Sequence, residues 1–525
     1  GGSDGDNMTA VAVNAAGEQF VSGISNSIDF PTTPGVYDDW AQNIDATVTK
    51  MNAAGTAIIW STYLGGAADD VIRNLVVDGN GRPLLAGYSA SWDYPTVNAY
   101  DPVGKGADST VYPGQEYDVV LSKLSADGAS LVFSTYFASS GPDQALGLAY
   151  DASGRIYISG SSYANDLPTT SGYQNRYAGG DSDGFVASFT GDGQTLRFCT
   201  YLGGTDVDNM GEVSVDPGSG RVAVTGTSES TNYPTKYAFQ RAISGSQGDG
   251  VISILDPAGK KLLYSTYVGG SLGLEEIIAS GFDSTGRLIA WGNSGASDLT
   301  VDRTFGTPGS NDGVLVAITP TYTKDYVVRF GGLQALFGFA IQADDKITVG
   351  GIDNGSDIPA TNGAFQYVNA DTNDAFVLRV NKTATQINYL SRIGGLGSDT
   401  AFDGNYDANG VWHIAGSTDA PDFPTTSTGY DRVLNILDGF ITQIDFSTAK
   451  VSIDPVSFTY GDATASLTLR IPTPVANSTN INLIGGGGIL QLPNTATIVA
   501  GNTSVTISVP LSYTTTDAGK LVRFT

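Results

Sequence analysis

The sequence predicts an all-β fold: a seven-bladed β-propeller followed by a small β-sandwich of the immunoglobulin-like (Ig-like) kind. Three observations favour this fold. A motif with two glycines returns along most of the 525 residues, each repeat carries four short strand patterns, and no stretch shows helical periodicity of useful length. The strand patterns have the period of two that is typical of sheets with one buried face.

The repeat is defined by the tetrapeptide Tyr63-Leu64-Gly65-Gly66, which returns as Tyr201-Leu202-Gly203-Gly204 and as Tyr267-Val268-Gly269-Gly270. Together with degenerate copies, it places the unit starts at residues 1, 65, 138, 203, 269, 331 and 394. We therefore expect a propeller over residues 1–454 and a second domain over residues 455–525. Gly1-Gly2 is the tail of a further copy, and the chain stops inside a strand pattern, so we expect more sequence, such as a signal peptide, outside both ends.

Each unit follows the same plan of four strands. A first strand with small residues leads into a tight Asp/Gly turn, and a second strand ends in glycine before a long loop. The third strand opens with an aspartate in every unit: Asp45, Asp118, Asp183, Asp249, Asp312, Asp374 and Asp438. The fourth strand carries an aromatic residue in six units: Trp60, Phe133, Phe198, Tyr264, Tyr326 and Tyr389. In the seventh unit we expect the fourth strand at Lys450 to Asp454.

Radial stacking explains this plan physically. A single four-stranded sheet cannot bury both of its faces, whereas sheets arranged around an axis cover one another. Small residues such as Gly147 and Gly338 suit the crowded innermost strands, and the aromatic residues suit the outer strands, which are spread apart. Closing the ring leaves only short edges, which protects the sheets from aggregation.

Composition excludes several classes of function. The chain has 53 acidic and 26 basic residues, so its net charge of −27 repels nucleic acids and anionic lipid surfaces. One cysteine, Cys199, excludes a disulfide framework and a cysteine-rich zinc site. One histidine, His413, excludes catalysis by several histidines. No apolar run approaches the roughly 18 residues of a membrane span.

The combined motifs resemble a known family. Ser61 to Gly66, Val77 to Gly81, Asp29 to Thr33 and Asp183 to Val186 are similar to the bacterial SBBP repeat, a seven-bladed β-propeller repeat. The resemblance covers residues 1 to 454 and is weakest in units five and six. It implies a secreted or surface-exposed bacterial protein, and it implies no defined catalytic residues.

The last 70 residues differ in composition from the repeats. They are rich in Thr, Ser and Val, and alternation over 466–471 and 503–509 predicts strands. The opening, Asp454 to Phe458, resembles the start of bacterial Ig-like surface domains. We expect an Ig-like sandwich, incomplete at its C-terminal end.

Acidic residues near the Gly-Gly junctions are the candidate metal ligands. If they gather at one mouth of the central channel, their oxygens fit Ca²⁺. The alternative is that they cap turns, and unit six has no acid at this place. The candidates are Asp4, Asp6, Asp69, Asp70, Asp206, Asp208 and Asp399. We expect the aspartates that open the third strands to be structural, accepting backbone N–H bonds at the turn.

Aromatic residues of the long loops are the candidate binding residues, because aromatic faces stack on sugar rings. They are Trp40, Trp92, Tyr94, Tyr100 and Tyr112. We expect the long loops to make the binding surface on one face of the propeller.

These patterns favour a non-catalytic secreted or cell-surface protein that acts in binding, in adhesion or as a scaffold subunit of an extracellular assembly, with a protein or glycan partner. One alternative is a carbohydrate-active propeller enzyme that uses a carboxylate pair, for which Glu116 and Glu275 are the residues to test. Another is a calcium-dependent glycan-binding module. No cofactor other than Ca²⁺ is suggested by the sequence.

Overall fold

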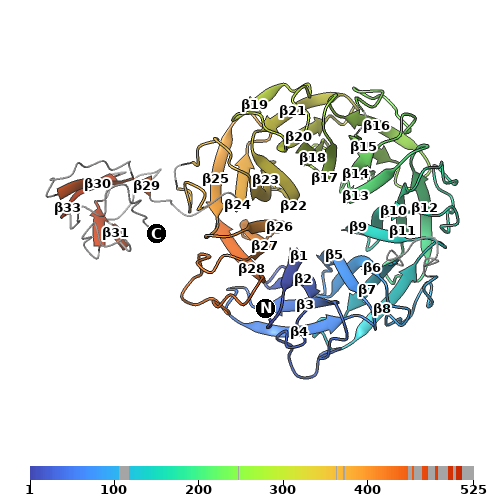
Figure 1. Ribbon diagram of the computed structural model, residues 1–525, viewed down its shortest axis with the longest axis horizontal. Coiled ribbons are helices and arrows are strands. Elements are labelled where there is room, and N and C mark those ends of the chain that lie inside the picture. Colours follow the sequence, from blue (N-terminus) through green and yellow to red (C-terminus); the bar gives the residue numbers. More distant parts are fainter. Residues whose placement is uncertain are drawn as a thin grey trace.

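In the computed structural model the repeats form a ring of seven antiparallel sheets around a central axis, so the predicted all-β, seven-bladed β-propeller is confirmed (Figure 1). The structure describes residues 1–105, 117–245, 247–361, 363–370, 373–446, 452–453, 464–470, 479–482, 495–499 and 504–510. Within these ranges there is no helix, and hence no helix that is long and apolar enough to cross a membrane.

Each blade is a meander whose strands run in sequence order from the axis outward. The innermost strands are β1 (Asp6–Val13), β5 (Asp70–Val77), β9 (Asp143–Tyr150), β13 (Asp208–Val215), β17 (Glu275–Phe282), β22 (Leu333–Ile341) and β26 (Asp399–Tyr406). The second strands are β2 (Gln19–Ser25), β6 (Pro83–Ser89), β10 (Ile156–Ser162), β14 (Val222–Ser228), β18 (Leu288–Ser294), β23 (Ile347–Asp353) and β27 (Val411–Thr418).

The outer half of each blade begins at the predicted aspartate. The third strands are β3 (Asp45–Met51), β7 (Asp118–Leu124), β11 (Asp183–Phe189), β15 (Asp249–Leu255), β20 (Asp312–Ile318), β24 (Asp374–Val380) and β28 (Asp438–Asp445). The outer strands are β4 (Ile58–Leu64), β8 (Leu131–Phe137), β12 (Leu196–Leu202), β16 (Leu262–Val268), β21 (Lys324–Phe330) and β25 (Ile387–Ile393). Blade five also has a short strand, β19 (Arg303–Phe305), parallel to β21.

Adjacent blades pack through small residues near the axis and through aromatic residues at the outside. A Cβ on Gly147 of β9 would lie 2.6 Å from the backbone of the next blade, which explains the small residue there. At the outside, the Trp60 Nε1–H donates to the Ala126 carbonyl (3.0 Å), and its ring covers Gly128, whose φ is +70°. Phe133 covers Gly193 in the same way. Each such aromatic residue therefore joins two blades.

Blade seven differs from the prediction. In the part of the chain that the structure describes, its sheet has the three strands β26, β27 and β28. The strand expected at Lys450 to Asp454 is not its fourth, because β29 (Ser452–Ile453) pairs instead with Leu469 and Arg470. These two residues belong to β30 (Thr464–Arg470), whose partner is β33 (Ser504–Pro510). The shared pattern of apolar positions in the repeats gave no sign of this exchange of partners.

The C-terminal segment contributes two small sheets. One is β29-β30-β33, and the other pairs β31 (Thr479–Asn482) with β32 (Thr495–Ile498). These strands agree with the prediction that the segment is made of β-strands, while the Ig-like topology stays a prediction.

Candidate functional site

The acidic residues that open the innermost strands, which we name the clamp residues, hold together the junctions between blades by accepting hydrogen bonds. Asp70 Oδ2 accepts hydrogen bonds from the Gly66 N–H (2.6 Å) and the Ser91 hydroxyl (2.9 Å). The same pattern recurs at Asp208 with Gly204 and Ser230. Asp6, Asp70, Asp208 and Asp399 are all fully buried. These four sequence candidates are therefore already engaged by the chain's own N–H and O–H groups.

The aspartates of the third strands lie beside them. Asp45 accepts the Gln42 N–H (2.9 Å), as expected for a residue that fixes a turn. A Cβ on Gly65 would fall 2.1 Å from Asp45 Oδ1 and 2.7 Å from Asp70 Oδ2, so two buried carboxyl groups flank that glycine. The junctions at Gly203 and Gly1 have the same arrangement.

Burial of these pairs has an electrostatic consequence. Desolvation, with a smaller contribution from the nearby charge of Asp45, raises the pKa of Asp70 to about 6. Desolvation likewise raises the pKa of Asp183 to about 7, with Asp208 adding to the effect. These buried carboxyl groups therefore bind a proton more readily than an exposed aspartate does.

The acidic candidates are thus gathered in pairs at separate junctions. Among the described residues, no three or more His, Cys, Asp or Glu side chains are grouped so as to hold a metal ion. Asp4, Asp69 and Asp206, the remaining candidates, are not buried like the four clamp residues, and Asp4 and Asp206 bond the N–H of the following residue. A pair of carboxylates offers fewer oxygens than the six to eight that Ca²⁺ takes. Calcium binding stays a prediction without a described ligand cluster.

The aromatic candidates divide into exposed and buried residues. Trp40 is 65% exposed and Trp92 is 83% exposed. Tyr94 is 3% exposed and bonds the Ser122 hydroxyl (3.0 Å), so it belongs to the core and not to a binding surface. Tyr100 packs edge-on against Phe189 in the adjacent blade. Tyr112 and Glu116 lie outside the described residues.

The long loops between the second and third strands, which we name the rim loops, lie against the outer strands. In blade two, Val97 and Ser134 exchange two backbone hydrogen bonds (2.9 and 2.7 Å). In blade four, Lys236 pairs with Ser265 in the same way. The loops were expected to form a surface on one face, but these contacts also carry them down the outside of the ring (Figure 1). The repeated Pro-Thr motif gave no signal for this.

The rim loops carry most of the large apolar side chains that are exposed in the described residues. These are Ile28, Trp40, Trp92, Val97, Val103, Tyr173, Tyr237, Phe239, Phe365, Tyr367, Val368, Tyr430, Val433 and Ile436. Exposed residues elsewhere are Ile59, Leu272, Leu274, Leu396 and Val499. The sequence patterns gave no signal for the exposed residues of blades three, four, six and seven, although these residues lie on the same loop of the repeat as Trp40 and Trp92.

The innermost strands carry two carboxyl groups, those of Glu212 and Asp403, that were not singled out from the sequence. Glu212 of β13 accepts a hydrogen bond from Asn74 Nδ2 (2.8 Å), and Asp403 of β26 accepts the Val11 N–H (2.9 Å). Burial raises the pKa of Glu212 well above its usual value, and Asp403 raises it further. Burial raises the pKa of Asp403 to about 7. Only the ring closure brings these residues together, because they lie on blades four and seven.

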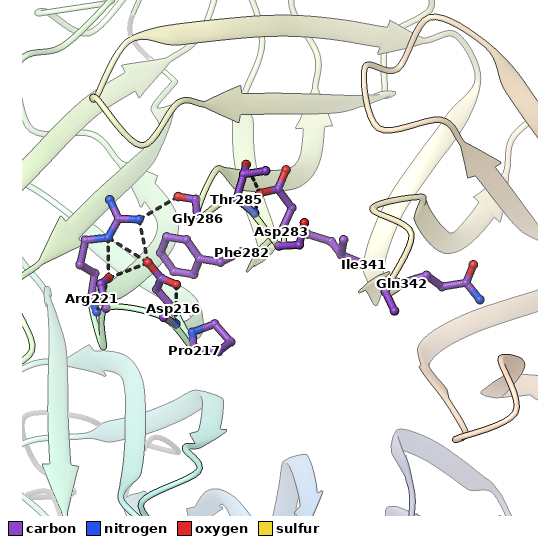
Figure 2. Close-up of a pocket in the computed structure, with 13 residues that line it drawn as sticks. Asp216, Pro217, Arg221, Phe282, Asp283, Thr285, Gly286, Ile341 and Gln342 are labelled. Carbon is purple, nitrogen blue, oxygen red and sulfur yellow. Dashed lines mark hydrogen bonds and ion pairs between the residues drawn. The ribbon is translucent and has the colours of Figure 1, made fainter.

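A pocket of about 540 Å³ opens at the opposite end of the ring from the rim loops, between the first turns of blades four, five and six (Figure 2). Its charged groups are satisfied internally. Arg221 Nη2 donates to Asp216 Oδ2 and to the Gly286 carbonyl, both at 2.7 Å. Asp283 accepts from Arg287 Nε (2.9 Å). The pocket is therefore a cleft between turns whose charged side chains bond one another and the backbone.

Glu275, a candidate for the enzyme hypothesis, is also a clamp residue. It is 1% exposed, opens β17, and accepts the Ala296 N–H (3.0 Å) and the Ser294 hydroxyl (2.9 Å). It therefore replaces the aspartate of the other junctions.

Comparison with known proteins does not assign this chain to a family. No protein-family model matches the chain, and no curated protein matches it. BamB from Moraxella catarrhalis is similar in structure, with 12% identity and a TM-score of 0.33 over 85% of this chain and 96% of that chain. A europium-containing methanol dehydrogenase has 10% identity and a TM-score of 0.35 over 78% and 83% of the two chains. A protein of unknown function from Dyadobacter fermentans has 14% identity and a TM-score of 0.38 over 67% and 90%. These likenesses carry no argument about function.

Proposed function

We propose that this protein is a non-catalytic bacterial protein, secreted or held at the cell surface, that binds an extracellular protein or glycan through its rim loops. The observation that carries the proposal is the exposure of Trp40, Trp92, Tyr237, Phe365 and Tyr367 on loops whose neighbouring strands are buried. Exposed aromatic side chains on a rigid scaffold are typical of binding surfaces for proteins and sugars. The net charge of −27 favours neutral or cationic partners over polyanions.

The test is binding of the purified protein to a glycan array and to immobilised extracellular proteins. Trp92→Ala and Trp40→Ala should each weaken the binding about tenfold or more, because large aromatic residues dominate such interfaces. Leu396→Ala is the matched control, since Leu396 is 64% exposed but lies outside the rim loops. Equal loss in the control, or no loss in either tryptophan variant, would contradict the proposal.

The alternative of a carbohydrate-active enzyme has one observation in its favour: the pKa of Glu212, on an innermost strand, is raised by burial and by the charge of Asp403. A carboxyl group with a raised pKa beside a second carboxyl group is the chemistry of a glycosidase acid. Against it, Asn74 and the N–H groups of Val213 and Leu148 already bond Glu212. Turnover on a glycan panel that Glu212→Gln abolishes, with the melting temperature unchanged, would favour the enzyme.

A further inference from the structure

Two tyrosines break the repeat at the outside of blades four and five. Tyr322 stands in the outer hairpin turn of blade five with a φ of +66°, and Tyr237 stands in the rim loop of blade four with a φ of +53°. Other blades have small residues at the left-handed positions of these two turns. They are Gly55, Gly128, Gly193, Gly259 and Ala384 in the hairpins, and Asn98 and Ser171 in the rim loops of blades two and three. A bulky side chain in this backbone region is an outlier that costs free energy, and such outliers gather at ligand-binding sites.

The two strained tyrosines stack on each other. Their rings are parallel within 4°, with the centroids 6.4 Å apart. Tyr264, the buried aromatic residue of β16, stacks on Tyr322 in turn, at 6.1 Å and 13°. Parallel rings at these separations are offset, so they do not cover each other completely. Tyr237 is exposed and Tyr322 is partly buried, so the stack is a stepped aromatic surface that rests on a core residue of blade four.

This aromatic surface continues into the pocket between blades four, five and six. The guanidinium group of Arg221 lies over the ring of Tyr322, 5.8 Å from its centroid, and over the ring of Phe282, 5.4 Å from its centroid. Arg221 and Phe282 both line the pocket, whose volume of about 540 Å³ is in the range of small-molecule sites (Figure 2). The rings of Phe282, Tyr322 and Tyr237 therefore mark one surface that leads from the pocket to the outside of the ring.

The lining of the pocket suits a neutral ligand with many hydroxyl groups. The hydroxyl groups of Ser219, Ser284 and Thr285 each donate to a carboxylate, which leaves lone pairs on their oxygens that can accept from a ligand. Gln342, a neutral amide, stands at the turn position that the repeat fills with an acid in other blades. These acids are Asp78, Asp151, Asp216, Asp283 and Asp407. The charged side chains of the pocket are already paired, Arg221 with Asp216 and Arg287 with Asp283.

We propose that this surface binds a neutral oligosaccharide, with one sugar ring in the pocket against Phe282 and further rings on Tyr322 and Tyr237. Sugar rings have C–H faces that pack on aromatic rings, and hydroxyl edges that donate to the serine and threonine oxygens. The proposal rests on the proposed function, because it names a neutral glycan as the partner. It places that glycan at a site that includes Tyr237 but neither Trp40 nor Trp92.

Charge and shape favour a neutral sugar over an acidic sugar or a protein. The net charge of −27 repels acidic sugars. Lys236, which lies over the Tyr237 ring, already donates to the Leu262 carbonyl (2.6 Å). A cavity of about 540 Å³ matches a small ligand, whereas a stable protein interface covers about 800 Å² on each partner.

The probes are cellohexaose, mannohexaose and chitohexaose, with hexagalacturonic acid as the acidic counterpart. Calorimetric titration of the intact protein should give saturable binding of at least one neutral probe and no binding of the acidic one. Tyr322→Gly and Tyr237→Asn should each weaken the binding about tenfold or more. Both variants restore a residue that another blade has at the same place, so they relieve backbone strain and should keep the fold. The Tyr322 N–H donates to the Thr319 carbonyl (2.9 Å) as the Gly259 N–H donates to the Asp256 carbonyl (2.9 Å), so a glycine fits this turn.

Further variants test the pocket and separate the two proposals. Phe282→Val copies Val215, which ends the innermost strand of blade four, and should also weaken the binding. Asn98→Gly makes a comparable change in the rim loop of blade two and should bind the probe normally. Trp92→Ala should also bind the probe normally while it loses the partner of the rim loops, so that failure of one proposal is distinguishable from failure of the other.

Four outcomes overturn the proposal. The first two are that no neutral probe binds, or that Tyr322→Gly binds as tightly as the unmodified protein. The third is that hexagalacturonic acid binds more tightly than the neutral probes. The fourth is that Trp92→Ala loses the probe and Tyr322→Gly keeps it, which would place the glycan on the rim loops of blades one and two and leave the proposed function standing. Capture of an extracellular protein that Tyr322→Gly reduces, with no sugar bound, would make this surface a protein interface and exclude the glycan.

Discussion

Blade seven and blade one share a repeat, but they differ in what lies outside their third strand. In blade one, β4 covers β3, its Tyr63 anchors the rim loop, and its Trp60 reaches the turn of blade two. In blade seven the described residues provide none of these three contacts. The comparison teaches that an outer strand completes its own sheet and also fastens that sheet to the next.

The junction between blades seven and one combines apolar packing with polar contacts. Ala415 and Ile441 of blade seven pack with an apolar cluster of blade one that includes Met8 and Val11. Gln443 Nε2 donates to the Ala53 carbonyl (2.7 Å), and Asn435 Nδ2 donates to the Gly2 carbonyl (2.5 Å). Near the axis, Val11 donates its N–H to Asp403. Hydrogen bonds of this kind contribute about 1 kcal/mol each, less than a buried aromatic side chain.

Removal of an interblade aromatic residue is the change with the largest expected effect. Phe133→Ala should lower the free energy of unfolding by about 3–5 kcal/mol, because it leaves a cavity over Gly193 between two blades. Gln443→Ala, whose side chain lies nearest the corresponding turn glycine, Gly55, between blades seven and one, should cost less than about 1 kcal/mol. Urea unfolding followed by tryptophan fluorescence measures both. Similar losses in the two variants would remove the distinction between the blades.

The pH should change the stability of the junctions. Burial raises the pKa of Asp70 and Asp208 to about 6, and that of Asp143, Asp183 and Asp249 to about 7. The folded protein therefore binds more protons than the unfolded chain between pH 4 and pH 7. The stabilisation is full below the unfolded pKa and is lost as the pH rises through 6 to 7. We expect the melting temperature to be higher at pH 5 than at pH 8.

A variant locates this pH dependence at the junctions. Asp183→Asn should reduce the difference between the two melting temperatures, because it removes a buried carboxyl group whose pKa is raised to about 7. Asp69→Asn is the control, because Asp69 is outside the buried pair. A steeper pH dependence in Asp183→Asn than in the unmodified protein would contradict this assignment.

Most of the fold could be predicted from the sequence because the repeat places the same residue types at the same steps. The aspartate of the third strand and the aromatic residue of the fourth fixed the order of strands in six blades, and β7 and β8 begin and end where these landmarks indicate. The seventh outer strand could not be predicted. Ile453 fits the pattern of apolar positions, but a local pattern does not specify which strand pairs with it.

The candidate site was predicted only in part, for a related reason. Trp40 and Trp92 are exposed as the loop pattern indicates, whereas Tyr94 is buried because it follows the loop inward to contact Ser122 and Tyr136. The pairing of Glu212 with Asp403 joins residues 191 positions apart in sequence. Only the curvature of the whole ring brings them together, and no motif encodes it.

Loss of the tyrosine hydroxyl that anchors a rim loop should have a smaller effect on the free energy of unfolding. Tyr136→Phe removes the hydroxyl that donates to the Ser91 carbonyl and accepts the Tyr94 N–H. Since both partners are buried, we expect a loss of about 1–3 kcal/mol and faster hydrogen exchange at Tyr94. Tyr237→Phe is the matched control, because Tyr237 is 68% exposed. Equal stability of the two variants would show that the Tyr136 hydroxyl does not anchor the rim loop.

Removal of divalent cations should have the smallest effect. The buried carboxyl groups of the junctions accept hydrogen bonds from Gly66, Ser91 and their equivalents, and each pair offers fewer oxygens than the six or more that a calcium ion needs. Treatment with EDTA at pH 7 should therefore leave the melting temperature of the ring unchanged. A fall that added Ca²⁺ reverses, and that Asp70→Asn abolishes, would instead place calcium at the junctions.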